Sequence, residues 1–147
     1  GMFETGRVDL AAVPEPWAST LVQNGAKVII STDEIAYGKT LPNTVLVASG
    51  SLLEDNKDIA KGLVKAQQEA VDFINNNQEE AQTIAIDSIK ELTKQELDKD
   101  LVQQAMERIT YTTEVDEAVI KEFAKSSYEL QFLKETPNLD GLVDTTL

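Results

Sequence analysis

The chain contains no cysteine and no histidine among its 147 residues, and only 5% of its residues are aromatic. Without these two residue types it cannot supply a disulfide, a cysteine nucleophile, a Ser-His-Asp triad or a zinc site of the usual ligand set. Chemistry carried out by this chain alone would rely on Asp, Glu, Lys, Ser, Thr or Tyr, and no pattern pairs a nucleophile with a base. We therefore expect no catalytic residue, no metal site and no cofactor.

Basic side chains are also scarce, since 13 Lys and Arg stand against 26 Asp and Glu, for a net charge of −13. Binding to a phosphate chain needs a basic surface that releases counterions, so the composition argues against a nucleic-acid partner. No apolar run approaches the ~20 residues that cross a bilayer, and no basic-then-apolar export signal opens the chain. The 41% hydrophobic content is enough for a packed core.

Residues 7–53 have the pattern of a mixed α/β region. Short apolar runs at 8–13, 27–31 and 44–48 are rich in β-branched residues and predict strands. Between the first two, Pro16 suits the first turn of a helix that runs to about Gln23 and ends at Asn24-Gly25. Strand, helix and strand at this spacing predict a parallel βαβ arrangement.

Residues 56–135 have the apolar periodicity of helices throughout. Asn56 can cap the first of them, and the three asparagines at 75–77 break it. Thr93-Lys94-Gln95-Glu96 has the pattern of a capping box, which predicts that a further helix begins there. On the first of these helices we expect a buried face made by Ile59, Leu63, Ala66, Ala70 and Ile74.

The segment after the first predicted strand carries the first candidate site residues, Glu15 and Trp17. They would lie at the carboxyl edge of the sheet, where ligands of open α/β sheets bind. There Glu15 could form hydrogen bonds to a small ligand and Trp17 could supply an apolar wall. The structural alternative is that Trp17 belongs to the core and that Glu15 is an acid favoured by the dipole of a helix start.

The loop after the second predicted strand carries three further candidates, Tyr37, Asn43 and Thr44. Loops on a rigid scaffold often bind ligands. Tyr-Gly and Pro-Asn sequences are equally typical of plain turns, so the same residues have a purely structural interpretation.

Several segments together resemble a known family. Residues 6–16, Gly-Arg-Val-Asp-Leu-Ala-Ala-Val-Pro-Glu-Pro, are similar to the G-x-V-D-A…E-P segment of ABC transporter solute-binding proteins. The branch concerned takes up nitrate, taurine, aliphatic sulfonates and thiamine precursors. Residues 41–49, Leu-Pro-Asn-Thr-Val-Leu-Val-Ala-Ser, are similar to its P-x-x-V-x-V-A-S crossing strand. Residues 137–144 resemble its C-terminal ending.

This resemblance implies a partial type 2 periplasmic-binding-protein fold, with a short mixed sheet in the first third followed by a helical C-terminal region. Residues 1–48 would be the end of the second α/β lobe and the crossing strand, and residues 49–147 the mainly helical C-terminal part of the first lobe. Members of the family have two complete lobes. The chain therefore resembles only their C-terminal half, without the export signal.

The function implied by the resemblance is capture of a small anionic or zwitterionic solute between two closing lobes and delivery to an ABC permease. The protein would be a binder without enzymatic activity, and the full-length parent would be periplasmic or anchored as a lipoprotein. Glu15 and Trp17 would face the cleft, and Asn43 and Thr44 would lie near the hinge. Because the first lobe supplies much of the pocket, we expect the isolated chain to bind solute weakly or not at all.

Two alternatives stay open. Thiamine-precursor synthases and some menaquinone-pathway enzymes resemble the same scaffold, but any such chemistry would have to reside in the missing half. The other alternative is a truncated remnant that binds no solute and self-associates. Open strand edges would then favour a homo-oligomer with exchanged elements.

Overall fold

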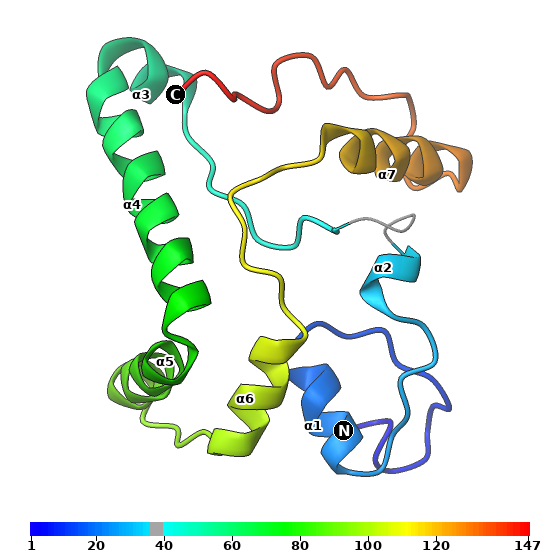
Figure 1. The fold of residues 1–147 in the computed structure, drawn as a ribbon. Helices are drawn as coiled ribbons and strands as arrows, with labels where there is room; N and C mark the ends of the chain where they lie inside the picture. The colour runs from blue at the N-terminus through cyan, green and yellow to red at the C-terminus, as the bar shows by residue number, and fades with distance from the viewer. Residues whose placement is uncertain (36–39) are drawn as a thin grey trace. The chain divides into compact units, whose positions relative to one another are not determined.

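The computed structural model describes residues 1–35 and 40–147 (Figure 1). About half of the chain is helical. The helices of the described residues are α1 (Trp17–Gln23), α2 (Thr32–Ile35), α3 (Gly50–Asp55), α4 (Lys57–Asn76), α5 (Gln78–Thr93), α6 (Lys99–Glu107) and α7 (Glu117–Glu129). The contacts between residues divide the chain into two units. Unit 1 comprises residues 1–29 and 71–111, and unit 2 comprises residues 30–70 and 112–147.

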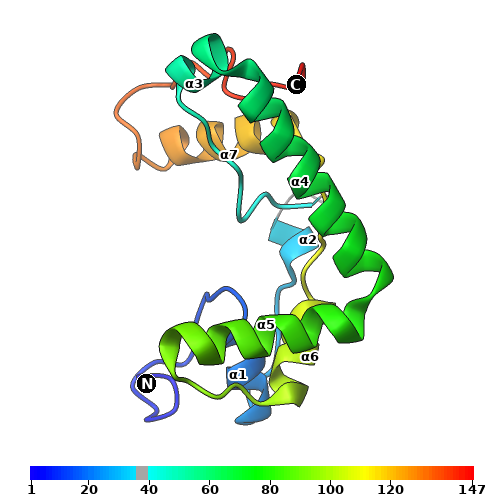
Figure 2. The same cartoon turned by 90° about the vertical axis from the view of Figure 1, so that its left-hand side faces the viewer.

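Unit 1 is built around α6, which packs against both α1 and α5 (Figure 2). The amide of Gln82 on α5 donates a 2.6 Å hydrogen bond to the backbone carbonyl of Lys99, and this bond ties α5 to the first residue of α6. Gln82 is only 4% exposed, so its polar group is buried together with a partner, as a buried amide requires. The buried apolar residues of this unit are Val71, Ala81, Val102 and Ala105.

Helix α1 has the bounds that its sequence predicts. It follows Pro16 and ends at Gln23, and Gly25 has the left-handed φ of +93° that a C-terminal glycine supplies. The backbone N–H of Ala26 donates to the carbonyl of Leu21 at 2.9 Å and closes this end of the helix. The prediction of a helix from Pro16 to about Gln23 is therefore confirmed.

Unit 2 contains α2, α3, most of α4, and α7. Its buried apolar residues are Ala60 on α4 and Val119 on α7. The hydroxyl of Thr113 donates a 2.7 Å hydrogen bond to the side-chain oxygen of Gln68, which joins the segment before α7 to α4. Helix α3 is capped by Ser49, whose hydroxyl accepts the backbone N–H of Leu52 at 3.2 Å.

The corner between α4 and α5 lies at the asparagines of residues 75–77, where the sequence predicts that the first long helix ends. Asn77 occupies the position before α5, yet its side chain accepts no hydrogen bond from the first turn of α5. Its amide instead donates to the carbonyl of Phe73 at 3.1 Å, and the amide of Asn76 donates to the carbonyl of Asp72 at 2.7 Å. The asparagine side chains thus add hydrogen bonds to carbonyls in the last turn of α4, and the carbonyl of Phe73 also accepts the backbone N–H of Asn77 at 2.8 Å.

The capping-box prediction at residues 93–96 is wrong. Thr93 is the last residue of α5, and Lys94 follows it with a left-handed φ of 62°. Helix α6 begins five residues later, after Asp98, whose carboxylate accepts the backbone N–H of Leu101 at 2.9 Å. Aspartate is as good a cap as threonine. The helix that begins at Lys99 is the one that packs against α1 and α5.

The predicted mixed sheet, and with it the partial type 2 periplasmic-binding-protein fold, is also wrong: within residues 1–35 and 40–147 no residue is in a strand. The runs 8–13, 27–30 and 44–48 lie outside the helices, and among the described residues no backbone hydrogen bond joins one run to another. Their apolar side chains are exposed, for example Leu10 at 70%, Ile29 at 70% and Val47 at 81%. β-Branched composition is only a local preference, and a strand forms only where a neighbouring strand takes its backbone groups.

The cap of α6 gives a direct test of its observed start. Asp98→Ala should lower the free energy of unfolding by about 1 kcal/mol, because the N–H of Leu101 loses its acceptor. Asp98→Ser keeps an acceptor at the same position and should restore most of the loss. Urea unfolding followed by circular dichroism measures both. Equal stability of Asp98→Ala and the unaltered chain would contradict the assigned cap.

Candidate functional site

Glu15, the first candidate ligand-binding residue, lies just before α1 in unit 1 and is occupied by contacts within the chain. One carboxylate oxygen accepts the backbone N–H of Ser19 at 3.0 Å. The other lies 3.5 Å from a guanidinium nitrogen of Arg108, which directly follows α6. The Glu15 side chain is 12% exposed and that of Arg108 is 35% exposed. Glu15 therefore links the first turn of α1 to the end of α6.

Ser19 lies in the same place and is fully buried, with an exposed fraction of 0%. Its backbone N–H is satisfied by Glu15, whereas its hydroxyl has no hydrogen-bond partner among the residues that the structure describes. Burying a hydroxyl without a partner costs its desolvation energy, so the Ser19 side chain lowers the free energy of unfolding.

Trp17, two residues after Glu15, is 62% exposed. It starts α1 but belongs to no buried cluster, so it is not a core aromatic. Exposure leaves the indole ring accessible from solvent, and it is the only tryptophan of the chain. Of the two candidates at the start of α1, the side chain of Glu15 is therefore largely buried and that of Trp17 is exposed.

Two of the remaining candidates lie in unit 2. Asn43 and Thr44 are exposed and adjacent in a segment without regular structure. Tyr37 lies outside the described residues. The structure therefore places Glu15 and Trp17 together at the start of α1, and Asn43 and Thr44 together in the other unit.

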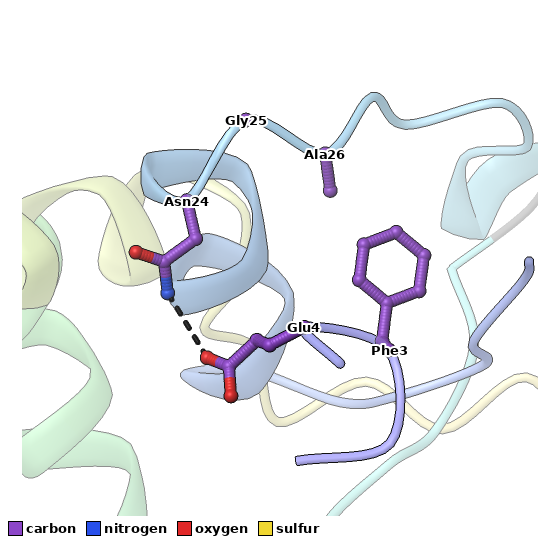
Figure 3. A pocket seen from close by; sticks show the side chains of 5 residues that line it. All are labelled: Phe3, Glu4, Asn24, Gly25 and Ala26. Carbon is purple, nitrogen blue, oxygen red and sulfur yellow. Dashed lines mark hydrogen bonds between the residues drawn. The ribbon is translucent and has the colours of Figure 1, made fainter. Parts of the chain in front are cut away.

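Two hollows lie on the surface of unit 1. The first, of about 440 Å³, is lined by Phe3, Glu4, Asn24, Gly25 and Ala26 (Figure 3). The second, of about 810 Å³, lies at the α4–α5 corner and is lined by residues 75–80 and Thr83. Neither hollow contains a residue that the sequence singled out as a site residue.

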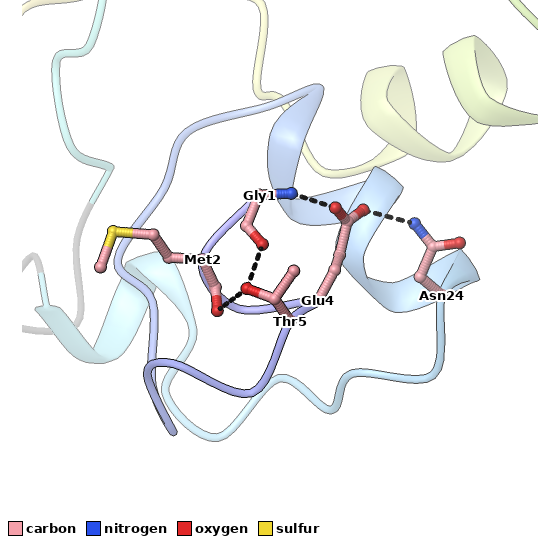
Figure 4. A network of polar contacts seen from close by, with 5 residues as sticks. All are labelled: Gly1, Met2, Glu4, Thr5 and Asn24. Atoms are coloured by element: carbon pink, nitrogen blue, oxygen red, sulfur yellow. Dashed lines mark hydrogen bonds and ion pairs between the residues drawn. The ribbon is translucent and has the colours of Figure 1, made fainter.

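Polar contacts fill part of the first hollow (Figure 4). The amide of Asn24 donates to one carboxylate oxygen of Glu4 at 3.2 Å, and the amino group of Gly1 pairs with the other. The hydrogen bond and the charge of that amino group lower the pKa of Glu4, and the Asn24 amide adds to the effect. The hollow is therefore lined by a carboxylate that is held in its charged form, which does not favour an anionic ligand.

Other features that would indicate a site are missing from the described residues. In this part of the chain no group of three or more acidic side chains could hold a metal ion. None of the helices described is both long enough and apolar enough to cross a membrane. Burial raises the pKa of Tyr111, but its backbone carbonyl accepts the amide of Asn75 at 3.2 Å, which is a structural contact.

Sequence reasoning missed Arg108 and Ser19. Arg108 stands 93 residues from Glu15 in the chain. No local pattern relates them, and only the packing of α6 on α1 brings them together. A weak signal was available for Ser19, because it is a small polar residue inside a short helix that packs on another element.

Comparison with known proteins identifies the family. A sequence model described as the NMT1-like family matches residues 2–88, more than half of the chain. The chain belongs to the NMT1-like family. This is the family of nitrate-, taurine- and sulfonate-binding proteins, so the resemblance inferred from residues 6–16 and 41–49 is confirmed at family level. Searches of the curated proteins and of the solved structures found no match to the chain.

NMT1-like proteins are solute-binding proteins of ABC importers and typically act outside the cytoplasm. Membership therefore supports small-molecule binding and partnership with a permease at the level of the family. The family match includes both Glu15 and Trp17 as well as Asn43 and Thr44. Arg108 lies beyond it.

The buried hydroxyl at position 19 predicts an unusual response to substitution. Ser19→Ala should raise the free energy of unfolding by about 1 kcal/mol, because it removes a buried polar group that has no partner. Ser19→Val, which adds volume at a fully buried position, should lower it by about 1–3 kcal/mol. Chemical denaturation measures both changes. A loss of stability in Ser19→Ala would show that the hydroxyl has a partner after all.

The contacts of Glu15 predict that substitution of Glu15 and substitution of Arg108 lower stability by different amounts. Glu15→Ala should be more destabilising than Arg108→Ala, because it also leaves the N–H of Ser19 without an acceptor, at a cost of about 1–3 kcal/mol. The coupling energy between the two charges in a double-mutant cycle should be only about 0.2–1 kcal/mol and should shrink as salt is added, since Arg108 is partly exposed. Equal effects of the two single mutations would contradict this account.

Proposed function

We propose that this NMT1-like chain contributes to a solute-binding component of an ABC importer, and that its solute is a small anion or zwitterion. An aliphatic sulfonate, taurine, nitrate or a thiamine precursor is the expected class. The observation that carries the proposal is the family match over residues 2–88. Binding involves no covalent chemistry, in keeping with a chain without histidine or cysteine.

The contacts around α1 support an anion-binding role for this part of unit 1. Arg108 brings a guanidinium, which has five N–H donors, to the start of α1, and its described contact is the 3.5 Å approach to Glu15. A sulfonate has oxygens in a geometry that a guanidinium can bind through two hydrogen bonds, as it does a carboxylate. Trp17 is exposed beside Glu15 in the sequence and offers an apolar surface to an aliphatic chain.

Asn43 and Thr44 are further proposed ligand-binding residues, and they belong to unit 2. Their side chains are exposed and carry one amide and one hydroxyl, which can donate to or accept from a zwitterion. Tyr37 stays a candidate on sequence grounds alone. The same proposal assigns residues 1–48 and residues 49–147 to different lobes of the binding protein. It also places that protein outside the cytoplasm.

A solution NMR titration with taurine, ethanesulfonate and nitrate tests the proposal, because it detects affinities in the millimolar range. We expect amide shift changes that saturate and that concentrate at residues 15–19 and 108 of unit 1. Saturable changes at residues 43–44 would show that unit 2 also binds the solute. The single tryptophan gives a second readout, and its fluorescence should change with the same midpoint. Ethanol, which keeps the two-carbon chain but lacks the sulfonate, is the control ligand and should leave the spectrum unchanged.

Two variants test whether the guanidinium of Arg108 binds the solute in this titration. Arg108→Met should weaken binding of an anion at least about tenfold, since it removes the guanidinium but keeps the aliphatic length. Arg7→Met removes a basic side chain from another part of unit 1 and should have no effect. Absence of saturable shifts with every solute, or equal effects of the two variants, would overturn the proposed site.

Self-association is the second candidate function. It is favoured by the many large apolar side chains that are exposed, among them Leu10, Ile29 and Val47. Exchange of elements between copies would cover such residues. Enzymatic activity has no comparable support, since the NMT1-like family is a family of binding proteins.

A further inference from the structure

The carboxylate of Glu15 pairs with the same guanidinium that we assign to the solute. Glu15, Ser19 and Arg108 all belong to unit 1. One oxygen of Glu15 lies 3.5 Å from a guanidinium nitrogen of Arg108, and the other accepts the backbone N–H of Ser19 at 3.0 Å. An anionic solute and Glu15 therefore need the same cation, and their two negative charges repel one another.

The two contacts of Glu15 differ in geometry. A hydrogen bond between a guanidinium and a carboxylate ordinarily spans about 2.7–2.9 Å, so the approach of Arg108 at 3.5 Å is long. The hydrogen bond from the N–H of Ser19 has an ordinary length, and its donor belongs to a fully buried residue. A sulfonate can form two parallel bonds of ordinary length with a guanidinium, in place of one long contact. Of its two contacts, Glu15 would therefore lose the one with Arg108 first.

The hydroxyl of Ser19 can receive the carboxylate oxygen that such a loss sets free. It is buried, and it has no hydrogen-bond partner among the residues that the structure describes. It belongs to the same residue as the N–H that already holds Glu15, and one carboxylate accepts several hydrogen bonds at once. A carboxylate that turns from Arg108 toward this hydroxyl would satisfy a donor that is otherwise buried alone.

We propose that Glu15 is an internal competitor of the solute at Arg108, and that Ser19 is a positioning residue for the displaced carboxylate. This inference rests on the proposed function, since it concerns the guanidinium that is assigned there to the solute. In the free chain Glu15 pairs with Arg108. In the bound chain the solute holds Arg108, and both the N–H and the hydroxyl of Ser19 donate to Glu15.

Titration of Glu15→Gln with ethanesulfonate and with nitrate, followed by NMR, tests the competition. Glutamine keeps the length of the side chain and an oxygen that can accept the N–H of Ser19, but it brings no negative charge to Arg108. The affinity for both anions should rise about three- to fivefold, the upper range for a partly exposed ion pair, because repulsion of the anion is lost as well. Glu91→Gln removes the same charge from an exposed position of α5 in unit 1 and should leave the affinity unchanged.

The direction of the change at Glu15 decides the outcome. An affinity of Glu15→Gln for the two anions that is equal to or lower than that of the unaltered chain would overturn the competition. Saturable binding by the unaltered chain would still support the proposed function in that case. Absence of binding in both chains would contradict the proposed function and this inference together.

Ser19→Ala tests the role of the hydroxyl, since it leaves in place the backbone N–H that Glu15 accepts. The affinity for ethanesulfonate should fall about two- to tenfold, the equivalent of one hydrogen bond that forms only in the bound chain. The same variant should be more stable than the unaltered chain without solute, because the free chain buries this hydroxyl without a partner. A purely structural role would not give a more stable chain that binds the solute more weakly.

A double variant shows whether Ser19 acts through Glu15. In the Glu15→Ala background, Ser19→Ala should no longer change the affinity for ethanesulfonate, because no carboxylate is left to hold. Circular dichroism verifies that each variant keeps its helix content. An unchanged affinity in Ser19→Ala alone, or an equal loss of affinity in the Glu15→Ala background, would overturn the role of Ser19.

Discussion

The packing of α6 against α1 and α5 is the interaction on which unit 1 depends. It buries Val102 and Ala105 of α6. It also brings Arg108 to the carboxylate of Glu15, although the two residues are far apart in the chain. The same arrangement lets Gln82 of α5 donate to the first residue of α6. Without α6, the start of α1 would lose the cation beside Glu15, and the proposed anion site would lose its guanidinium.

A second constraint governs the apolar runs of the first third. Backbone N–H and C=O groups in an extended segment require partners, which a sheet or water supplies. In the described residues the runs 8–13, 27–30 and 44–48 find no partner strand, and their side chains are exposed. Exposed apolar surface of this kind marks places where another surface binds.

Sequence reasoning succeeded where structure is set by neighbours in the chain. Pro16 and Gly25 delimit α1 because each acts on its own backbone angles, and at the end of α4 Asn76 and Asn77 bond to carbonyls four residues back. It failed where a distant partner decides. The capping pattern at Thr93 was locally sound, but α6 begins after Asp98. Glu15 was singled out as a ligand-binding residue, which stays a prediction, and its partner Arg108 could not be found without the packing of α6 on α1.

The sequence by itself determined the family, through short segments whose residues match the NMT1-like pattern at positions 6–16 and 41–49. It also determined the exclusion of histidine and cysteine chemistry, because composition does not depend on conformation. The tertiary structure alone decided that the β-rich runs do not pair and that the carboxylate of Glu15 is held by Ser19 and Arg108. The physical reason is that strand pairing, ion pairing and burial are each properties of two surfaces, and a local pattern describes only one of them.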